Sequence, residues 1–414
     1  MYVAKQFTLD RMSVRSRWLG ALAIAVLFAG FFAFGAWTGR YQPEPLRAEN
    51  AAGDTTCLSC HASKATFETT AHRLTSRSPT PGSIIGSFSP PGNLLPTVNP
   101  RLYFRMDSTA TGYYQTAVFG RRPDTTVRSE RVDIVTGSGR RGQSFLYWRG
   151  DRLYQLPVSH WTILGWANSP AYPDGRANFD RPIPPRCLEC HMAAAHSISE
   201  ADDPAHNRYS RDGMLLGLMC ETCHSSGQAH VKRERSVLHA VRSSAIINPG
   251  RLTRKQKLDA CALCHGGAVD LQSQPFSFVP GQAVLKKNPF YAPPTGAQVD
   301  VHGDQVGQLE RSKCFAASQM TCLTCHDVHR PQHNVAEFSG KCMTCHTVQS
   351  CGLFPTYGNA LMGKCVSCHM PRLPSLSVIS NYEGRAVRQP IRAHWIKVYP
   401  DFRSLAAIAD SAKQ

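Results

Sequence analysis

Seven copies of one short motif carry most of the reactive side chains of this chain. Fourteen of its sixteen cysteines form pairs separated by two residues, and a histidine follows each pair directly. The paired cysteines are Cys57 and Cys60, Cys187 and Cys190, Cys220 and Cys223, Cys261 and Cys264, Cys322 and Cys325, Cys342 and Cys345, and Cys365 and Cys368. The adjoining histidines are His61, His191, His224, His265, His326, His346 and His369.

This C-x-x-C-H spacing is typical of covalent haem attachment. The two thiols form thioether bonds to one haem, while the adjacent imidazole binds its iron. Zinc sites also use C-x-x-C pairs, but they do not need a histidine directly after every pair. The sequence therefore predicts seven c-type haems, with the fourteen cysteines as attachment sites and the seven motif histidines as proximal iron ligands.

The second ligand of each iron decides what chemistry it can do. Two imidazoles make a six-coordinate iron suited to electron relay, whereas an open position suits substrate chemistry. His329 lies three residues after His326, too close to turn back onto the same haem, so we expect it to bind the iron of a neighbouring haem. The histidines outside the motifs are His72, His160, His196, His206, His230, His239, His302, His329, His333 and His394.

The formal net charge of +17 first raises nucleic acid as a partner. Each ferric haem c brings about one negative charge and each ferrous haem about two, so seven haems lower the total to roughly +10 or +3. Much of the remaining arginine and lysine is suited to pairing with haem propionates. Nucleic-acid binding is therefore not expected.

An uncharged apolar run at residues 18–39 is long enough to span a bilayer. Basic residues precede it, which predicts a cytoplasmic N-terminus and an exported remainder. We expect a retained transmembrane helix in the inner membrane with a periplasmic haem domain. A cleaved signal peptide, with Ala33-Phe34-Gly35 as a processing site, is the alternative. The basic residues are Lys5, Arg11, Arg15 and Arg17.

Motif spacing divides the chain into residues 1–40 (tail and anchor), 41–186 (first haem site and a β-rich region) and 187–414 (a six-haem array). Short apolar runs such as Leu102–Phe104 and Ser144–Trp148, separated by glycine turns, predict the strands. In the last part we expect porphyrins to form the core. The predicted fold is mainly α with irregular loops around a multihaem core, plus a β-rich insert and an N-terminal transmembrane helix.

Several segments resemble the multihaem c-type cytochromes of exported bacterial electron-transfer chains, distantly akin to hydroxylamine oxidoreductase and cytochrome c nitrite reductase. The resemblance implies a mainly helical haem array without fixing a substrate. It also adds distal iron ligands to His329, namely His72, His230, His302 and His394. The segments are Gly137–Gly139, Gln155–Trp161, Cys220–His224 with His230, Asp300–Gln305, Ser312–Phe315, Met320–His329, Cys368–Pro371 and Arg392–Ile396.

The favoured function is electron transfer between a membrane or quinol donor and a downstream redox partner. The alternative is a multihaem oxidoreductase acting on a small nitrogen or sulfur compound. No catalytic residue is predicted, because the chain has neither a C-x-x-C-K motif nor a defensible triad. Two cysteines outside the motifs, Cys314 and Cys351, leave a disulfide, two buried thiols or a reactive site open. The sequence does not indicate an oligomeric state.

Overall fold

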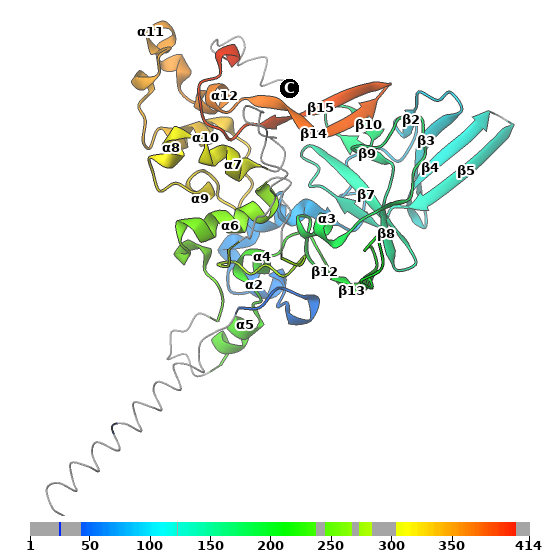
Figure 1. The fold of residues 1–414 in the computed structure, drawn as a ribbon, viewed down its shortest axis with the longest axis horizontal. Coiled ribbons are helices and arrows are strands. Elements are labelled where there is room, and N and C mark those ends of the chain that lie inside the picture. Colours follow the sequence, from blue (N-terminus) through cyan, green and yellow to red (C-terminus); the bar gives the residue numbers. More distant parts are fainter. Residues whose placement is uncertain are drawn as a thin grey trace, which may run out of the picture.

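The structure is a computed structural model that describes residues 25, 43–121, 123–236, 245–266, 273–283 and 304–402, except the side chains of residues 376 and 377. Two parts lie beside each other in Figure 1, one built of β-sheets from the middle of the chain and one of short helices. The helices are α2 (Asp54–Leu58), α3 (Pro185–Glu189), α4 (Cys220–His224), α5 (Gln228–Glu234), α6 (Arg254–His265), α7 (Gln305–Glu310), α8 (Lys313–Ala316), α9 (Cys322–Cys325), α10 (Val335–Cys342), α11 (Phe354–Tyr357) and α12 (Cys365–His369).

Two antiparallel sheets form the β-rich part. A seven-stranded sheet has the order β1-β6-β7-β8-β11 with β9 and β10 attached through β7, and a four-stranded sheet has the order β2-β3-β4-β5. The strands are β1 (Ser76–Arg77), β2 (Leu94–Pro96), β3 (Leu102–Thr109), β4 (Gly112–Arg121), β5 (Asp124–Arg131), β6 (Ile134–Thr136), β7 (Gly142–Arg149), β8 (Arg152–Gln155), β9 (Val158–Trp161), β10 (Gly165–Asn168) and β11 (Arg181–Pro182). The strands expected between residues 102 and 156 are present.

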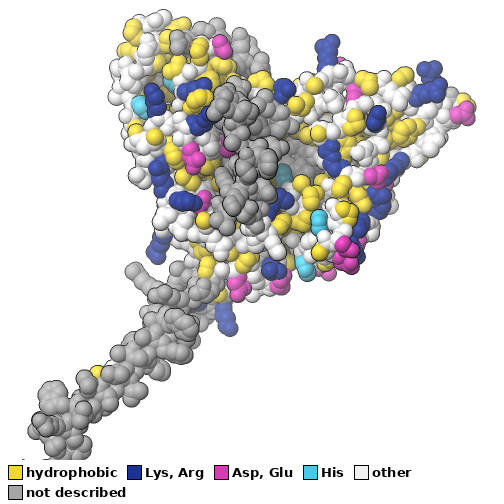
Figure 2. Space-filling model, viewed as in Figure 1, with side chains coloured by type: hydrophobic (Ala, Val, Ile, Leu, Met, Phe, Trp, Pro, Cys, Tyr) yellow, Lys and Arg dark blue, Asp and Glu magenta, His cyan; other side chains and the backbone are white. Residues whose placement is uncertain are grey.

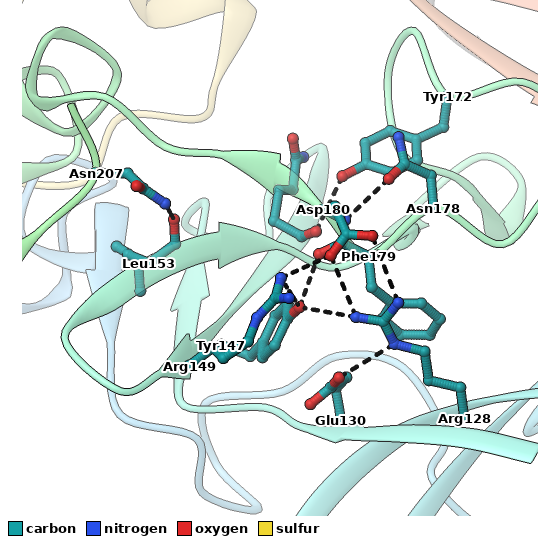
Figure 3. Close-up of polar contacts among 11 residues, drawn as sticks. Arg128, Glu130, Tyr147, Arg149, Leu153, Tyr172, Asn178, Phe179, Asp180 and Asn207 are labelled. Carbon is teal, nitrogen blue, oxygen red and sulfur yellow. Dashed lines mark hydrogen bonds and ion pairs between the residues drawn. The ribbon is translucent and has the colours of Figure 1, made fainter. Parts of the chain in front are cut away.

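A conventional apolar core joins these two sheets. Phe104 on β3, Phe145 on β7 and Val158 on β9 are fully buried in one cluster. A polar link reinforces the packing: the Asp180 carboxylate accepts hydrogen bonds from Arg149 at 2.6 Å and from Arg128 at 3.4 Å (Figure 3). Because Arg128 is on β5 and Arg149 on β7, Asp180 bridges the sheets, and these arginines lower its pKa. Such exposed ion pairs contribute about 1 kcal/mol or less each.

The helices are short because each motif needs only one helical turn. In a helix, residues three and four apart share a face. A motif such as α4 therefore directs both thiols and the following imidazole to the same side. The longest described helix, α6, begins at Arg254 and is capped by Thr253, whose hydroxyl accepts a hydrogen bond from the Gln256 amide in a capping box. It ends at His265, the motif histidine.

The predicted mainly helical fold is wrong. Helices hold 29% and strands 27% of the residues that the structure describes. Residues 187–414, expected to be helical apart from loops, contain two hairpins: β12 (Met192–Ser197) with β13 (Tyr209–Leu216), and β14 (Arg372–Tyr382) with β15 (Arg385–Arg392). Glu383 and Gly384 join the second hairpin with φ angles of 50° and 73°, the two positive values of a tight hairpin turn.

The predicted transmembrane helix has no counterpart in the described residues. None of the helices in the described ranges combines the length and the apolar character that crossing a bilayer requires. The apolar segment at residues 18–39 lies outside these ranges except for Ala25.

Candidate haem-binding sites

Four motif histidines each face a histidine from a distant part of the chain. The ring centres of His61 and His230 are 6.5 Å apart, and those of His265 and His72 are 6.2 Å apart. His224 and His329 are separated by 6.3 Å, and His326 and His394 by 6.4 Å. Each pair therefore combines one predicted proximal ligand with one predicted distal ligand.

The spacing of these pairs fits an iron between the rings. Two imidazole nitrogens on opposite sides of one iron, each about 2.0 Å from the metal and about 1.1 Å from its ring centre, hold the ring centres about 6.2 Å apart. The four observed distances lie between 6.2 and 6.5 Å. By contrast, the described residues contain no group of three or more His, Cys, Asp or Glu side chains placed to share one metal ion. The residues present fit haem ligation.

Hydrogen bonds fix the orientation of several of these rings. Nδ1 of His224 lies 2.9 Å from the Ile247 carbonyl, and Nδ1 of His394 lies 3.1 Å from the Arg392 carbonyl. A carbonyl only accepts, so Nδ1 carries the proton and Nε2 keeps the lone pair that a metal requires. The motif histidine His369 is held in the same way by the Lys397 carbonyl at 2.9 Å.

Burial favours the neutral form of the facing rings. It is the largest cause that lowers the pKa of His72 and that of His394 to about 4. Burial also lowers the pKa values of His224, His265 and His326. A neutral imidazole is the form that binds metal, so these surroundings suit ligation.

Other histidines named in the sequence analysis lie outside these four pairs or outside the described residues. His346 and His369 face no imidazole at this spacing within the described ranges, while His302 and His239 lie outside them. The carbonyl of His191 accepts hydrogen bonds from the Thr75 and Ser76 hydroxyls, each at 2.8 Å.

Four histidines that are neither motif histidines nor predicted distal ligands lie mostly on or near strands. His160 packs edge-on against Trp166 in the β-rich part, with Nδ1 buried and without a hydrogen-bond partner in the described residues. His333 is exposed before α10, and His196 is exposed on β12. His206 follows β12 in a loop and has a positive φ of 44°.

Neighbouring motifs touch through their thiols. Four pairs of thiols from different motifs lie close enough to shift each other's pKa, namely Cys57 with Cys220, Cys190 with Cys264, Cys261 with Cys322, and Cys342 with Cys365. Cys325 also lies close enough to Cys342 to interact electrostatically with it. Together with the His224–His329 pair, these contacts join all seven motifs into one contiguous set. None of the sixteen cysteines, all of which are described, forms a disulfide, and this includes Cys314 and Cys351.

Buried carboxylates hold the motifs against one another, a role that the sequence reasoning missed. Glu221, inside the third motif, is 1% exposed and accepts hydrogen bonds from the backbone amides of Ala52 and Gly53 at 2.9 Å and of Gly227 at 2.6 Å. In the opposite direction, the Asp54 carboxylate accepts a hydrogen bond from the Cys220 backbone amide at 2.9 Å. The signal in the sequence was an acidic residue inside a C-x-x-C-H motif, because a buried carboxylate needs several hydrogen-bond donors.

Glu189 has the same role in the second motif. It is 4% exposed, it accepts a hydrogen bond from the Phe276 amide at 2.7 Å, and it pairs with Arg186. The contact joins α3 to the segment after the fourth motif.

Comparisons of the chain with protein-family models, curated proteins and solved structures found no match. The resemblance to multihaem cytochromes therefore stays a prediction from the sequence.

Proposed function

We propose that this protein is an exported heptahaem c-type cytochrome that transfers electrons between a membrane or quinol donor and a downstream redox partner. The main support for this proposal is that the seven motifs lie next to one another in one continuous set. Thiol contacts and facing histidines link motifs that are far apart in sequence, as a relay over short distances requires.

Different residues of the protein would attach the haems and bind their irons. The fourteen motif cysteines would attach them, and the four histidine pairs would hold irons from both sides. When bound, haem supplies one-electron chemistry at its iron. The Nδ1 hydrogen bonds of His224 and His394 restrain ring rotation, which favours a coordination that stays the same in both oxidation states.

Basic and acidic side chains are mixed on one face of the protein. On the face drawn in Figure 2, Lys and Arg side chains of the described residues are dispersed over both parts and interspersed with Asp and Glu. A nucleic-acid site on this face would concentrate the basic side chains in one patch or stripe. Membrane attachment through residues 18–39 stays a prediction, and sequencing of the mature N-terminus decides between an anchor and a cleaved signal peptide.

The number of haems tests the proposal most directly. The intact mass of the mature protein is expected to exceed that of the polypeptide by seven haems, because each C-x-x-C-H motif attaches one. Pyridine haemochrome and iron assays on the same sample should agree with that number. Replacing Cys57 and Cys60 together with alanine is the matched control and should remove one haem. A fully matured protein with six or fewer haems would contradict the proposed count.

Spectroscopy and turnover measurements distinguish an electron-transfer protein, here called the conduit, from a multihaem oxidoreductase. We expect the ferric protein to be fully low-spin, to exchange electrons rapidly with small redox partners, and to show negligible turnover of nitrite, hydroxylamine, sulfite or tetrathionate. A fully low-spin spectrum also requires second ligands at the irons of the three motif histidines outside the four pairs, His191, His346 and His369. A high-spin fraction near one-seventh that disappears on cyanide addition, together with turnover of one of these compounds, would replace the conduit by the oxidoreductase.

A further inference from the structure

Four arginines converge where the β-rich part meets the haem motifs. Arg140 and Arg141 follow the Gly137–Gly139 turn after β6, whereas Arg372 and Arg392 are directly paired across β14 and β15. The Arg141 guanidinium donates a hydrogen bond to the Pro390 carbonyl at 3.0 Å, which ties the turn to the hairpin. Figure 1 shows this hairpin reaching from α12 toward β9 and β10.

Arg392 connects the cluster to the last motif. Its guanidinium donates to the carbonyl of Met370 at 2.8 Å, directly after α12. Its own carbonyl accepts the Nδ1 hydrogen bond of His394, the histidine that faces His326. Arg392 therefore lies between His394, which faces His326 of the fifth motif, and α12 of the seventh motif.

The four positive charges repel one another. Burial and the charge of Arg372 lower the pKa values of Arg140 and Arg141. Arg392 lies close enough to Arg372 and Arg141 for their positive charges to interact. Within the described residues none of the four forms an ion pair, although arginines such as Arg149 and Arg152 pair with aspartates.

An arrangement of this kind is stabilised by an anion. Arg372 and Arg392 are half-buried, and half-buried like charges are costly without a counter-charge. Guanidinium groups bind carboxylate or oxyanion oxygens in a two-point geometry. Haem carries two propionate carboxylates, which gives a source of anions beside His394.

We propose that Arg140, Arg141, Arg372 and Arg392 form a binding site for carboxylate or oxyanion groups, filled by the propionates of the haem held between His326 and His394. This assignment rests on the proposed function. The anion oxygens accept hydrogen bonds from the guanidinium groups, and the positive charge stabilises the reduced form of that haem, which carries one more negative charge than the oxidised form.

Redox titration of the double variant Arg140→Gln/Arg141→Gln tests the site. These side chains are exposed and come from a turn, whereas Arg392 holds the α12 carbonyls and is left intact. The potential of one low-spin haem should move to more negative values, and the other components should stay in place. That component should be the one whose low-spin signal is lost in His394→Ala. The control is Arg385→Gln, an exposed arginine at the turn end of the same hairpin.

Added inorganic phosphate at constant ionic strength distinguishes the two sources of the anion. If propionates fill the site, phosphate leaves the wild-type titration unchanged. If the site binds a free oxyanion, phosphate shifts the potential of that haem in the wild-type protein, and the double variant does not respond. That result would confirm the arginine site but replace the propionates by a free oxyanion as its occupant. A double variant that titrates like Arg385→Gln, with and without phosphate, overturns the site. A preparation without covalent haem refutes the proposed function instead, and phosphate binding then tests the arginines alone.

Discussion

Replacing His329 with alanine is expected to convert one of the low-spin ferric haems to high-spin. His329 faces His224 with ring centres 6.3 Å apart, so the substitution would remove one of two axial imidazoles. Electron paramagnetic resonance should show about one-seventh of the iron gaining a high-spin signal that cyanide abolishes. The haem count should stay at seven, because no attachment cysteine changes.

The backbone around His329 should tolerate this change. The Thr66 hydroxyl donates to the His329 carbonyl at 2.7 Å, and the His329 amide donates to Asp327 at 3.0 Å. Both contacts use main-chain atoms that alanine keeps. The matched control is His333→Ala, since His333 is exposed four residues later. Unchanged low-spin signals in His329→Ala, or the same new signal in His333→Ala, would rule out the assigned role.

Replacing Glu221 with alanine should strongly destabilise the fold around the first and third motifs. Three backbone amides, those of Ala52, Gly53 and Gly227, would lose their shared acceptor. Because unpaired buried donors are costly, we expect the free energy of unfolding to fall by about 3 to 5 kcal/mol. Denaturant unfolding followed by circular dichroism measures this change.

Two further variants sharpen the Glu221 test. Glu221→Gln keeps one oxygen acceptor and should lose less stability than the alanine variant. Glu68→Ala removes an exposed carboxylate near the first motif and should leave the free energy of unfolding unchanged. Equal unfolding midpoints for Glu221→Ala and Glu68→Ala would show that the Glu221 contacts contribute little.

The chemistry of this protein could be predicted from local sequence. A thiol, two intervening residues, a second thiol and an imidazole form one chemical unit, so each motif predicts its cofactor without knowledge of the fold. His329 was also accessible locally, because its distance from His326 excludes binding to the same haem. Strands such as β3 and β7 followed from apolar alternation between glycine turns.

The sequence was misleading where local pattern and tertiary packing differ. The β14–β15 hairpin lies in a segment expected to be helical, and its turn at Glu383 and Gly384 was not recognised as a hairpin signal. The hairpin is stabilised by contacts distant in sequence, including the bond from Arg141 to Pro390. Such contacts leave no periodic trace in the strands themselves.

Sequence alone therefore predicts the cofactor class and its attachment residues, and it shows the supply of spare histidines. Only the tertiary structure decided which histidine faces which motif, as in His61 with His230 and His265 with His72. The physical reason is that the pairing depends on how separate segments are held together. The buried Glu221 and Asp54 do this for the first and third motifs through backbone amides of the opposite segment. Residue spacing within either segment does not encode that contact.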